Sequence, residues 1–198
     1  MLIYEDKLPG NIRVDFVDTV KHYSSQLGIN PNWLMAIMNF ESAGTFSPSI
    51  QNSTTNATGL IQFMPSTAVE LGTSVDALKQ MSAVQQLEYV YYYYDRYRSK
   101  LNSYVDLYLV TFFPRAVGKS EDYVLQTSNL SASTIASSNP VFDLNNDSQI
   151  QVKEIRKVMT DKIPAEWKHE FENTGTGGST GAIVATTVVL ITAIAILA

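Results

Sequence analysis

The sequence predicts an all-α fold over most of its length, and three observations support this. Apolar residues recur at helical spacing in several stretches between residues 11 and 172. No stretch alternates apolar and polar residues over a convincing length, so strands are not expected. Residues typical of helix starts and ends stand at the edges of these stretches and divide them into separate helices.

The first two predicted helices are separated by a short turn. Apolar residues follow a helical period up to Leu27, and Gly28 ends the run. Asn30 is a typical helix cap and Pro31 a typical first-turn residue, so the second helix is expected to begin here. This helix carries Glu41 at its end.

Later segments continue the helical pattern. Residues 43–58 are rich in Gly, Ser, Thr and Asn and predict a long loop. Pro65 is expected to open a short helix, and two longer helices are expected over residues 82–100 and 103–113. Three tyrosines of the 82–100 helix are expected to share one face: Tyr89, Tyr92 and Tyr93.

The composition fits one compact domain with additional segments. The chain has 198 residues, 45% of them hydrophobic, and a chain of this length buries a core without disulfides. It has no cysteine, which excludes thiolate zinc sites, iron–sulfur clusters and cysteine nucleophiles. Its two histidines lie far apart in the sequence, which argues against a histidine-rich metal centre. A net charge of -5 without basic runs argues against nucleic acid as a partner.

The C-terminal segment differs from the rest of the chain. Residues 173–181 have the composition of a Gly/Ser/Thr linker, and residues 182–198 carry no charge. As a helix, residues 182–198 would be about 25 Å long, slightly short of the ~30 Å hydrocarbon core. We predict a transmembrane anchor here; a buried core element is the alternative. The N-terminus has no signal-peptide pattern.

Glu41 ends a largely apolar helix and precedes a polar loop. Desolvation raises the pKa of a carboxyl group because the charged form loses hydration, and the negative end of the helix dipole acts in the same direction. A raised pKa keeps the carboxyl protonated near neutral pH, as a general acid requires. The local pattern also fits an ordinary surface glutamate in a last helical turn.

The residues around Glu41 form an ordered motif, with FESAGTFSP at residues 40–48, NATGLIQFMPSTA at residues 56–68, and Leu71-Gly72. This resembles the SLT family of lytic transglycosylases, whose pattern is a Glu-Ser pair, a Phe-x-Pro, and then G-A-x-G-L-M-Q-x-x-P-x-T-A-x-x-L-G. The resemblance implies a lysozyme-like helical domain over residues 1–140 and peptidoglycan glycan strands as the substrate.

By position, the resemblance makes Glu41 the catalytic acid/base and Ser42 the serine that follows it. It implies that Gln62 lies against polar groups of the sugar and that Met64 forms an apolar floor. Gly59 and Leu60 match other residues of the segment that walls the sugar site.

The chain departs from the family in its A-Y-N-A-G motif, which is replaced by VTFFPRAVG at residues 110–118. Phe113 is expected either to keep a stacking wall there or to pack in the core. Tyr123 resembles a tyrosine of a later motif that approaches the catalytic acid. The departure affects how the substrate is expected to be bound more than which class of reaction is expected.

The resemblance implies a reaction with a single carboxylate. Glu41 would protonate the glycosidic oxygen, and the 2-acetamido group of N-acetylmuramic acid (MurNAc) would attack its own anomeric carbon. Glu41 would then act as a base on the 6-hydroxyl, which closes a 1,6-anhydro ring. The alternative is a hydrolytic muramidase with a second carboxylate, for which the candidates are Glu70, Glu88 and Asp106.

Residues 141–172 are expected to form an EF-hand-like loop and helix. DLNNDSQIQVKE at residues 143–154 resembles the 12-residue loop that binds Ca²⁺ through hard oxygen ligands. Ser148 replaces the usual glycine, Ile150 is expected to anchor the loop in the core, and Pro140 interrupts the entering helix. The alternative is a solvated acidic turn. The predicted ligands of a structural calcium ion are Asp143, Asn145, Asp147, Gln149, Gln151 and Glu154.

These features together predict a membrane-anchored enzyme that cleaves peptidoglycan. The Tyr-rich helix and the Phe-Pro variant resemble phage members of the family, so we expect a place in a virion membrane, with other virion proteins as further partners and a role in opening the cell wall during infection. A non-catalytic peptidoglycan-binding virion protein is one alternative. A membrane-tethered, calcium-responsive adaptor is another.

Overall fold

The computed structural model describes residues 1–172, which are mostly helical. The predicted all-α fold is confirmed in this range, where three isolated β-bridges form but no strand. The architecture is consistent with a lysozyme-like helical domain. The helices are α1 (Arg13–Leu27), α2 (Pro31–Glu41), α3 (Pro65–Glu70), α4 (Val75–Gln80), α5 (Ala83–Asp95), α6 (Tyr104–Phe112), α7 (Ala132–Ser138) and α8 (Val152–Asp161), with 3-10 turns at Glu5–Lys7, Arg98–Lys100, Pro114–Ala116 and Ala165–Glu170.

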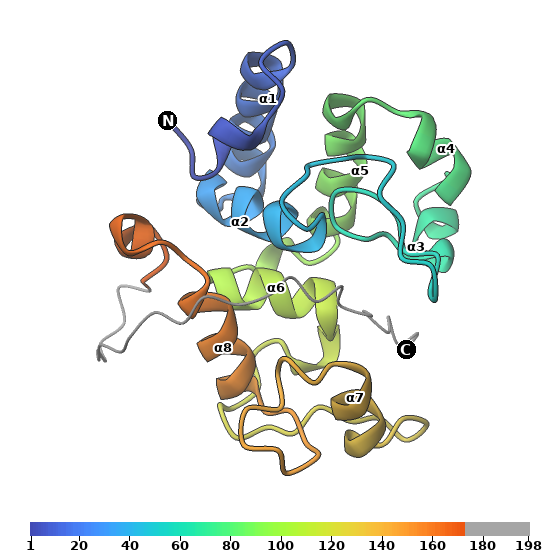
Figure 1. Ribbon diagram of the computed structural model, residues 1–198, viewed down its shortest axis with the longest axis vertical. Coiled ribbons are helices and arrows are strands. Elements are labelled where there is room, and N and C mark those ends of the chain that lie inside the picture. The colour runs from blue at the N-terminus through green and yellow to red at the C-terminus, as the bar shows by residue number, and fades with distance from the viewer. Residues whose placement is uncertain (173–198) are drawn as a thin grey trace.

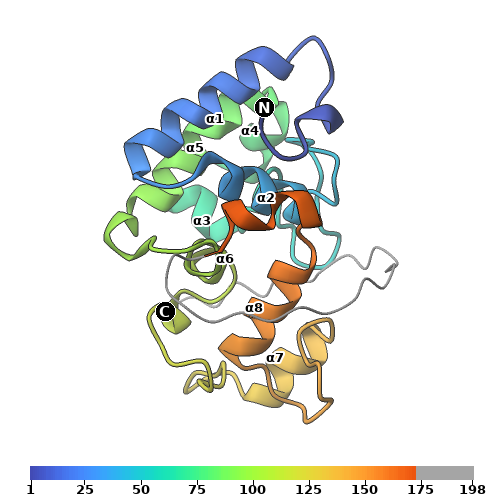
Figure 2. The same cartoon turned by 90° about the vertical axis from the view of Figure 1, so that its left-hand side faces the viewer.

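Helix α6 lies between two groups of helices (Figures 1 and 2). On one side of α6, α1 packs along α5 and against α2. On the other side, α8 packs against α6, and α7 lies beyond it. Because α6 contacts α2 as well as α8, it connects the helix that carries Glu41 to the C-terminal part of the described chain.

Helix α2 is buried along much of its length. Asn30 caps it by accepting a hydrogen bond from the backbone N–H of Asn32 (2.9 Å), and Pro31 occupies its first turn. A helix that is apolar around most of its circumference is stable only when surrounded by other elements. The rigid packing of α2 therefore fixes the position of Glu41 at its end. Its buried apolar residues are Leu34, Met35, Ala36, Ile37 and Met38.

An aromatic cluster joins α2, α6 and the segment that precedes residues 143–154. The ring of Phe40 meets that of Tyr108 edge-on at 5.5 Å, and Phe142 lies 5.1 Å from Phe112. These contacts cross the predicted domain boundary at residue 140, and the buried side chains on both sides form one core. The boundary itself stays a prediction.

The last described residues fold back onto the start of α2. The indole N–H of Trp33 donates to the carbonyl of Glu170 (2.9 Å), and the Asn30 amide donates to the Glu170 carboxylate (2.7 Å). Phe171 packs edge-on against Tyr104 at 4.8 Å. The chain therefore reaches residue 172 near the end of α2 that is opposite to Glu41.

The linker predicted at residues 173–181 and the membrane anchor predicted at residues 182–198 lie outside the described residues. Among residues 1–172, we find no helix with the length and apolar character needed to cross a bilayer.

Of the three tyrosines of α5 predicted to share one face, Tyr89 and Tyr92 lie together, with ring centroids 6.2 Å apart, but Tyr93 faces another way. Tyr93 is buried, whereas Tyr92 is 43% exposed and donates to the carboxylate of Glu88 (2.6 Å). Consecutive helical residues point about 100° apart, so Tyr92 and Tyr93 face solvent and core respectively. The face of Tyr93 is the one that matters for the site described next.

Candidate active site

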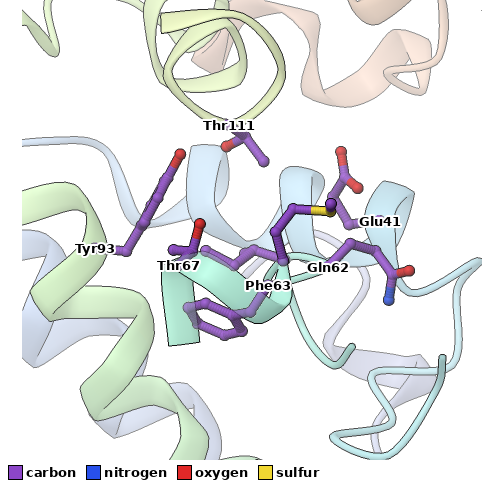
Figure 3. Close-up of a pocket in the computed structure, with 8 residues that line it drawn as sticks. Glu41, Gln62, Phe63, Thr67, Tyr93 and Thr111 are labelled. Atoms are coloured by element: carbon purple, nitrogen blue, oxygen red, sulfur yellow. The ribbon is translucent and has the colours of Figure 1, made fainter. Parts of the chain in front are cut away.

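Glu41 lies in a pocket formed by four helices and one turn (Figure 3). Glu41 comes from the end of α2, Thr67 from α3, Tyr93 from α5 and Thr111 from α6. Figure 3 shows Glu41 and Tyr93 at two ends of the pocket, with the Glu41 carboxyl pointing toward the side of α6. The remaining lining residues belong to the turn after Gly59 and are Ile61, Gln62, Phe63 and Met64.

The carboxyl group of Glu41 has no hydrogen-bond or ion-pair partner among residues 1–172, and its side chain is only partly exposed. Burial raises its pKa to about 8, because the charged form loses hydration without gaining a compensating contact. At neutral pH the carboxyl is therefore largely protonated and able to donate a proton. The desolvation expected from the sequence is confirmed by this geometry.

The loop after α2 is held by its own polar groups. Buried Ser42 caps the helix, and its hydroxyl accepts the backbone N–H of Phe46 (2.9 Å). Phe46 has a positive φ of 50° and packs edge-on against Phe16 at 5.8 Å. Ser42 thus supports the loop beside Glu41 and does not line the pocket.

The turn at residues 58–63 forms one wall of the pocket. Thr58 and Phe63 exchange two backbone hydrogen bonds of 3.0 and 2.8 Å, and Gly59 has a φ of 84°. Gln62, also at positive φ, donates through its side-chain amide to the Gly59 carbonyl (3.1 Å). This compact turn presents Gln62 to the pocket as part of a fixed surface.

The structure brings together only some of the predicted sugar-site residues. Gln62 and Met64 line the pocket with Glu41, whereas the side chains of Leu60 and Phe113 are buried in the core. The side chain of Tyr123 is not in the pocket either, and it lies near Lys119, whose ammonium is 5.7 Å from its ring.

Two lining residues that the sequence did not suggest are Tyr93 and Thr111. The Tyr93 hydroxyl donates to the backbone carbonyl of Val110 (2.7 Å), and the Thr111 hydroxyl lies 2.5 Å from that of Tyr94. These bonds connect α5 to α6 at the pocket. Tyr93 is two helical turns from Gln86 on the buried face of α5, and this period is the signal that could have identified it.

None of the three alternative carboxylates lines the pocket of Glu41. Glu70 accepts a hydrogen bond from Arg96 (2.9 Å), and Glu88 lies on the solvent face of α5. Asp106 accepts from the hydroxyl of Ser103 (2.8 Å) at the start of α6. Among the described lining residues, Glu41 is therefore the only acid.

Residues 143–154, here called the acidic loop, form a compact turn in which side-chain oxygens accept backbone N–H groups. Asp143 accepts from Asp147 and Ser148 (3.1 and 3.0 Å), and Asp147 accepts from Gln149 (2.9 Å). Glu154 accepts from the backbone N–H groups of Leu144 and Gln151 (3.0 and 2.9 Å), and these two bonds close the loop.

Two features of the acidic loop agree with the sequence-based expectation. Ile150 is fully buried, and Ser148 has a φ of 63° at the position that usually holds glycine. The backbone N–H of Leu125 donates to the Ile150 carbonyl (2.9 Å), so the loop is also fixed from outside. The oxygen donors suit Ca²⁺ chemically, although no group of three His, Cys, Asp or Glu side chains in residues 1–172 is arranged to hold a metal.

Comparison with known proteins identifies one family. The family model of the transglycosylase SLT domain matches residues 18–102, which include Glu41, Gln62 and Tyr93 but not Thr111. Searches among curated proteins and among solved structures found no match. The SLT domain is that of lytic transglycosylases, enzymes that act on peptidoglycan, so the match over residues 18–102 supports an enzyme activity of this kind and binding of peptidoglycan.

Proposed function

We propose that the SLT domain of this chain cleaves the β-1,4 bond between MurNAc and N-acetylglucosamine with Glu41 as its single acid/base and leaves a 1,6-anhydro-MurNAc end. The observation that supports this most is a lone carboxyl in the pocket, kept protonated by burial. A general acid needs a pKa near the working pH, and a value of about 8 meets that condition at neutral pH.

In the first step, Glu41 donates its proton to the glycosidic oxygen as the bond to the anomeric carbon breaks. The oxygen of the substrate's own 2-acetamido group bonds to that carbon and replaces the leaving group. Glu41 is then a carboxylate in a desolvated pocket, which makes it a stronger base than in water.

In the second step, Glu41 takes the proton of the 6-hydroxyl group. The 6-oxygen attacks the anomeric carbon, the bond to the acetamido oxygen breaks, and the anhydro ring closes. The proton given away in the first step is thereby regained, and no water is consumed. Gln62 and Tyr93, which wall the pocket on either side, are the residues we propose to hold the sugar in this geometry.

The positions of the other acids favour this reaction over hydrolysis. A hydrolytic glycosidase uses a second carboxylate at about 5–10 Å to act as the nucleophile or to activate water. Glu70 is engaged by Arg96, and Glu88 and Asp106 lie outside the pocket lining. The substrate's acetamido group is then the nucleophile that remains.

The test is digestion of purified peptidoglycan by the whole protein, followed by mass spectrometry of the products. We expect anhydro ends, each lighter by one water than a reducing end, and loss of activity in Glu41→Gln with the fold retained. Glu70→Gln, the same change at an exposed acid, is the control and should remain active. Reducing ends in the products, or an active Glu41→Gln, would contradict the proposal.

We also propose that the acidic loop binds one structural Ca²⁺ ion. Support comes from its oxygen donors, from the positive φ of Ser148 and from the buried anchor Ile150. Calorimetry of the protein with CaCl₂ should show binding of one ion, and a chelator should lower the melting temperature. Asp143→Asn should weaken both effects, whereas a protein that binds no Ca²⁺ and melts unchanged with chelator would contradict it.

Membrane attachment through residues 182–198 is a further proposal, supported by their uncharged sequence. In a phage particle this anchor would hold the enzyme in the virion membrane, among other virion proteins, where it would open the cell wall during infection. The full chain should sediment with membranes, and Val189→Arg should release it. If both proteins stay in the supernatant, the anchor is wrong.

A further inference from the structure

We propose that Gln86 is a positioning residue of the active site, which from α5 fixes the turn that carries Gln62 and Met64 beside Glu41. The catalytic part of this inference rests on the proposed function. The side chain of Gln86 does not line the pocket, so its effect would pass through the turn.

The carboxamide of Gln86 is fully buried and binds three backbone groups. Its oxygen accepts the N–H of Leu60 (2.7 Å), and its nitrogen donates to the carbonyls of Pro48 and Leu78 (both 3.0 Å). The three partners belong to the loop after α2, to the turn at residues 58–63 and to the end of α4. Because an unsatisfied buried polar group is costly, the side chain holds these three segments in one arrangement.

Gly59 makes this arrangement possible. It adopts a left-handed φ of 84°, which glycine tolerates best, and it lies against the Gln86 carboxamide so closely that a β-carbon would overlap it. The turn therefore cannot move toward α5, and the bond between Leu60 and Gln86 prevents it from moving away.

The position of Leu60 in turn sets the wall of the pocket. The turn is closed by the two backbone bonds between Thr58 and Phe63, so a shift at Leu60 would carry Gln62 with it. Gln86 also lies on the same face of α5 as Tyr93, two turns earlier. One helix thus supports two walls of the pocket, directly through Tyr93 and indirectly through Gln86.

The test compares wild type with Gln86→Met, which has a similar length but cannot bind the three backbone groups. We expect kcat on peptidoglycan to fall about 10- to 100-fold with a smaller change in KM, because a displacement of about 1 Å has effects of this size. We also expect activity to be lost at a lower pH, since a displaced wall admits water to Glu41.

Two further variants separate positioning from loss of stability. Leu27→Ala truncates a buried residue at the end of α1, so it should lower the melting temperature and leave kcat and the pH profile unchanged. Gln86→Glu keeps an acceptor for Leu60 N–H and, when protonated, can donate to one carbonyl. It should therefore recover part of kcat at acidic pH.

A ¹³C NMR titration of the Glu41 carboxyl gives a readout that needs no activity. Its pKa should be lower in Gln86→Met than in wild type and unchanged in Leu27→Ala. If wild type does not cleave peptidoglycan, the proposed function fails while this titration still tests the positioning. Wild-type kcat and titration in Gln86→Met, or the same changes in Leu27→Ala, would overturn the inference.

Discussion

The two long loops of this protein are stabilised in different ways. The pocket loop, residues 42–64, has internal bonds such as that from Phe46 to Ser42, but it also depends on Gln86, a residue of helix α5 that is 26 positions from Leu60. In the acidic loop most side-chain bonds are internal, as between Leu144 and Glu154, and backbone bonds such as that from Leu125 to Ile150 join the loop to the preceding segment. Both loops contain non-glycine residues at positive φ, including Gln62 and Ser148.

This difference suits the two loops to different tasks. A loop anchored on a separate helix keeps its shape relative to the rest of the molecule, which a pocket wall requires. In a loop whose side-chain oxygens accept its own N–H groups, those oxygens can release the N–H groups and bind another partner that prefers oxygen ligands. The carboxyl group next to the pocket loop also differs from the one in the acidic loop. That of Glu41 has no hydrogen-bond or ion-pair partner in residues 1–172, whereas that of Glu154 accepts two hydrogen bonds.

The largest effect is expected from Gly59→Ala, which breaks the long-range support of the pocket loop. The added β-carbon would displace Gln86, so kcat should fall on the order of 100-fold in an assay of peptidoglycan cleavage. Gly28→Ala is the matched control, because Gly28 also has a positive φ but open space around its α-carbon. Equal losses in the two variants would mean that backbone strain alone is responsible.

A change in the acidic loop should affect stability and spare activity. Glu154→Gln keeps one acceptor oxygen and loses the other, so one of the N–H groups of Leu144 and Gln151 is left without its partner. We expect a loss of about 1–3 kcal/mol in the free energy of unfolding, measured by urea denaturation, with kcat within about twofold of wild type. The exposed Glu166→Gln serves as control, and a large fall in kcat would show that the loops are coupled.

The unpaired carboxyl of Glu41 should make stability depend on pH. Since burial raises its pKa from 4.5 to about 8, the folded state binds the proton more tightly than the unfolded state. Its contribution to stability is thus complete below pH 4.5 and is lost as pH rises toward 8. Glu41→Gln should therefore be more stable than wild type by about 4 kcal/mol at pH 8–9 and equal to it near pH 4.

Urea denaturation at several pH values would measure this difference. The exposed Glu70→Gln should show no such trend, which separates burial from the removal of an acid in general. If the stability of Glu41→Gln and wild type stays parallel across the pH range, Glu41 is not desolvated as the structure indicates.

The smallest effect is expected from Ser148→Gly in the acidic loop. Glycine relieves the left-handed backbone at φ 63° but loses more conformational freedom on folding, so a net gain of about 0.5 kcal/mol is expected. A thermal melt under chelator, with Ser133→Gly in α7 as a destabilised helical comparison, would measure it. A loss of stability in Ser148→Gly would point to a role for the serine hydroxyl.

The sequence predicted those parts of the fold and site that depend on neighbouring residues. The order of the longer helices, the cap at Asn30 and the burial of Ile150 are local or periodic properties, and the structure confirms them. The apolar helix before Glu41 and the polar loop after it predicted desolvation of its carboxyl group, but the resemblance of residues 40–72 to the SLT family was needed to single it out as a candidate. Gln62 and Met64 could be placed beside it through the motif they share with Glu41.

The rest of the site depends on contacts between distant segments, which a single sequence does not specify. Tyr93 and Thr111 meet at the pocket only because α5 and α6 pack together, and Gln86 gains its role only when Pro48, Leu60 and Leu78 converge on it. The prediction of a common face for Tyr92 and Tyr93 failed because adjacent residues diverge on a helix. The roles proposed for Phe113, Tyr123 and the calcium ligands stay predictions.

The contact between Trp33 and Glu170 has a mechanical consequence under the proposed attachment through residues 182–198. The two residues meet near the start of α2, and Glu41 is the last residue of this 11-residue helix, about 16 Å farther along its axis. A pull applied near residue 172 would reach the core through the capped end of that helix. The end of α2 that carries Glu41 would bear little of this force, so a pull on the proposed anchor would leave the geometry of the pocket unchanged.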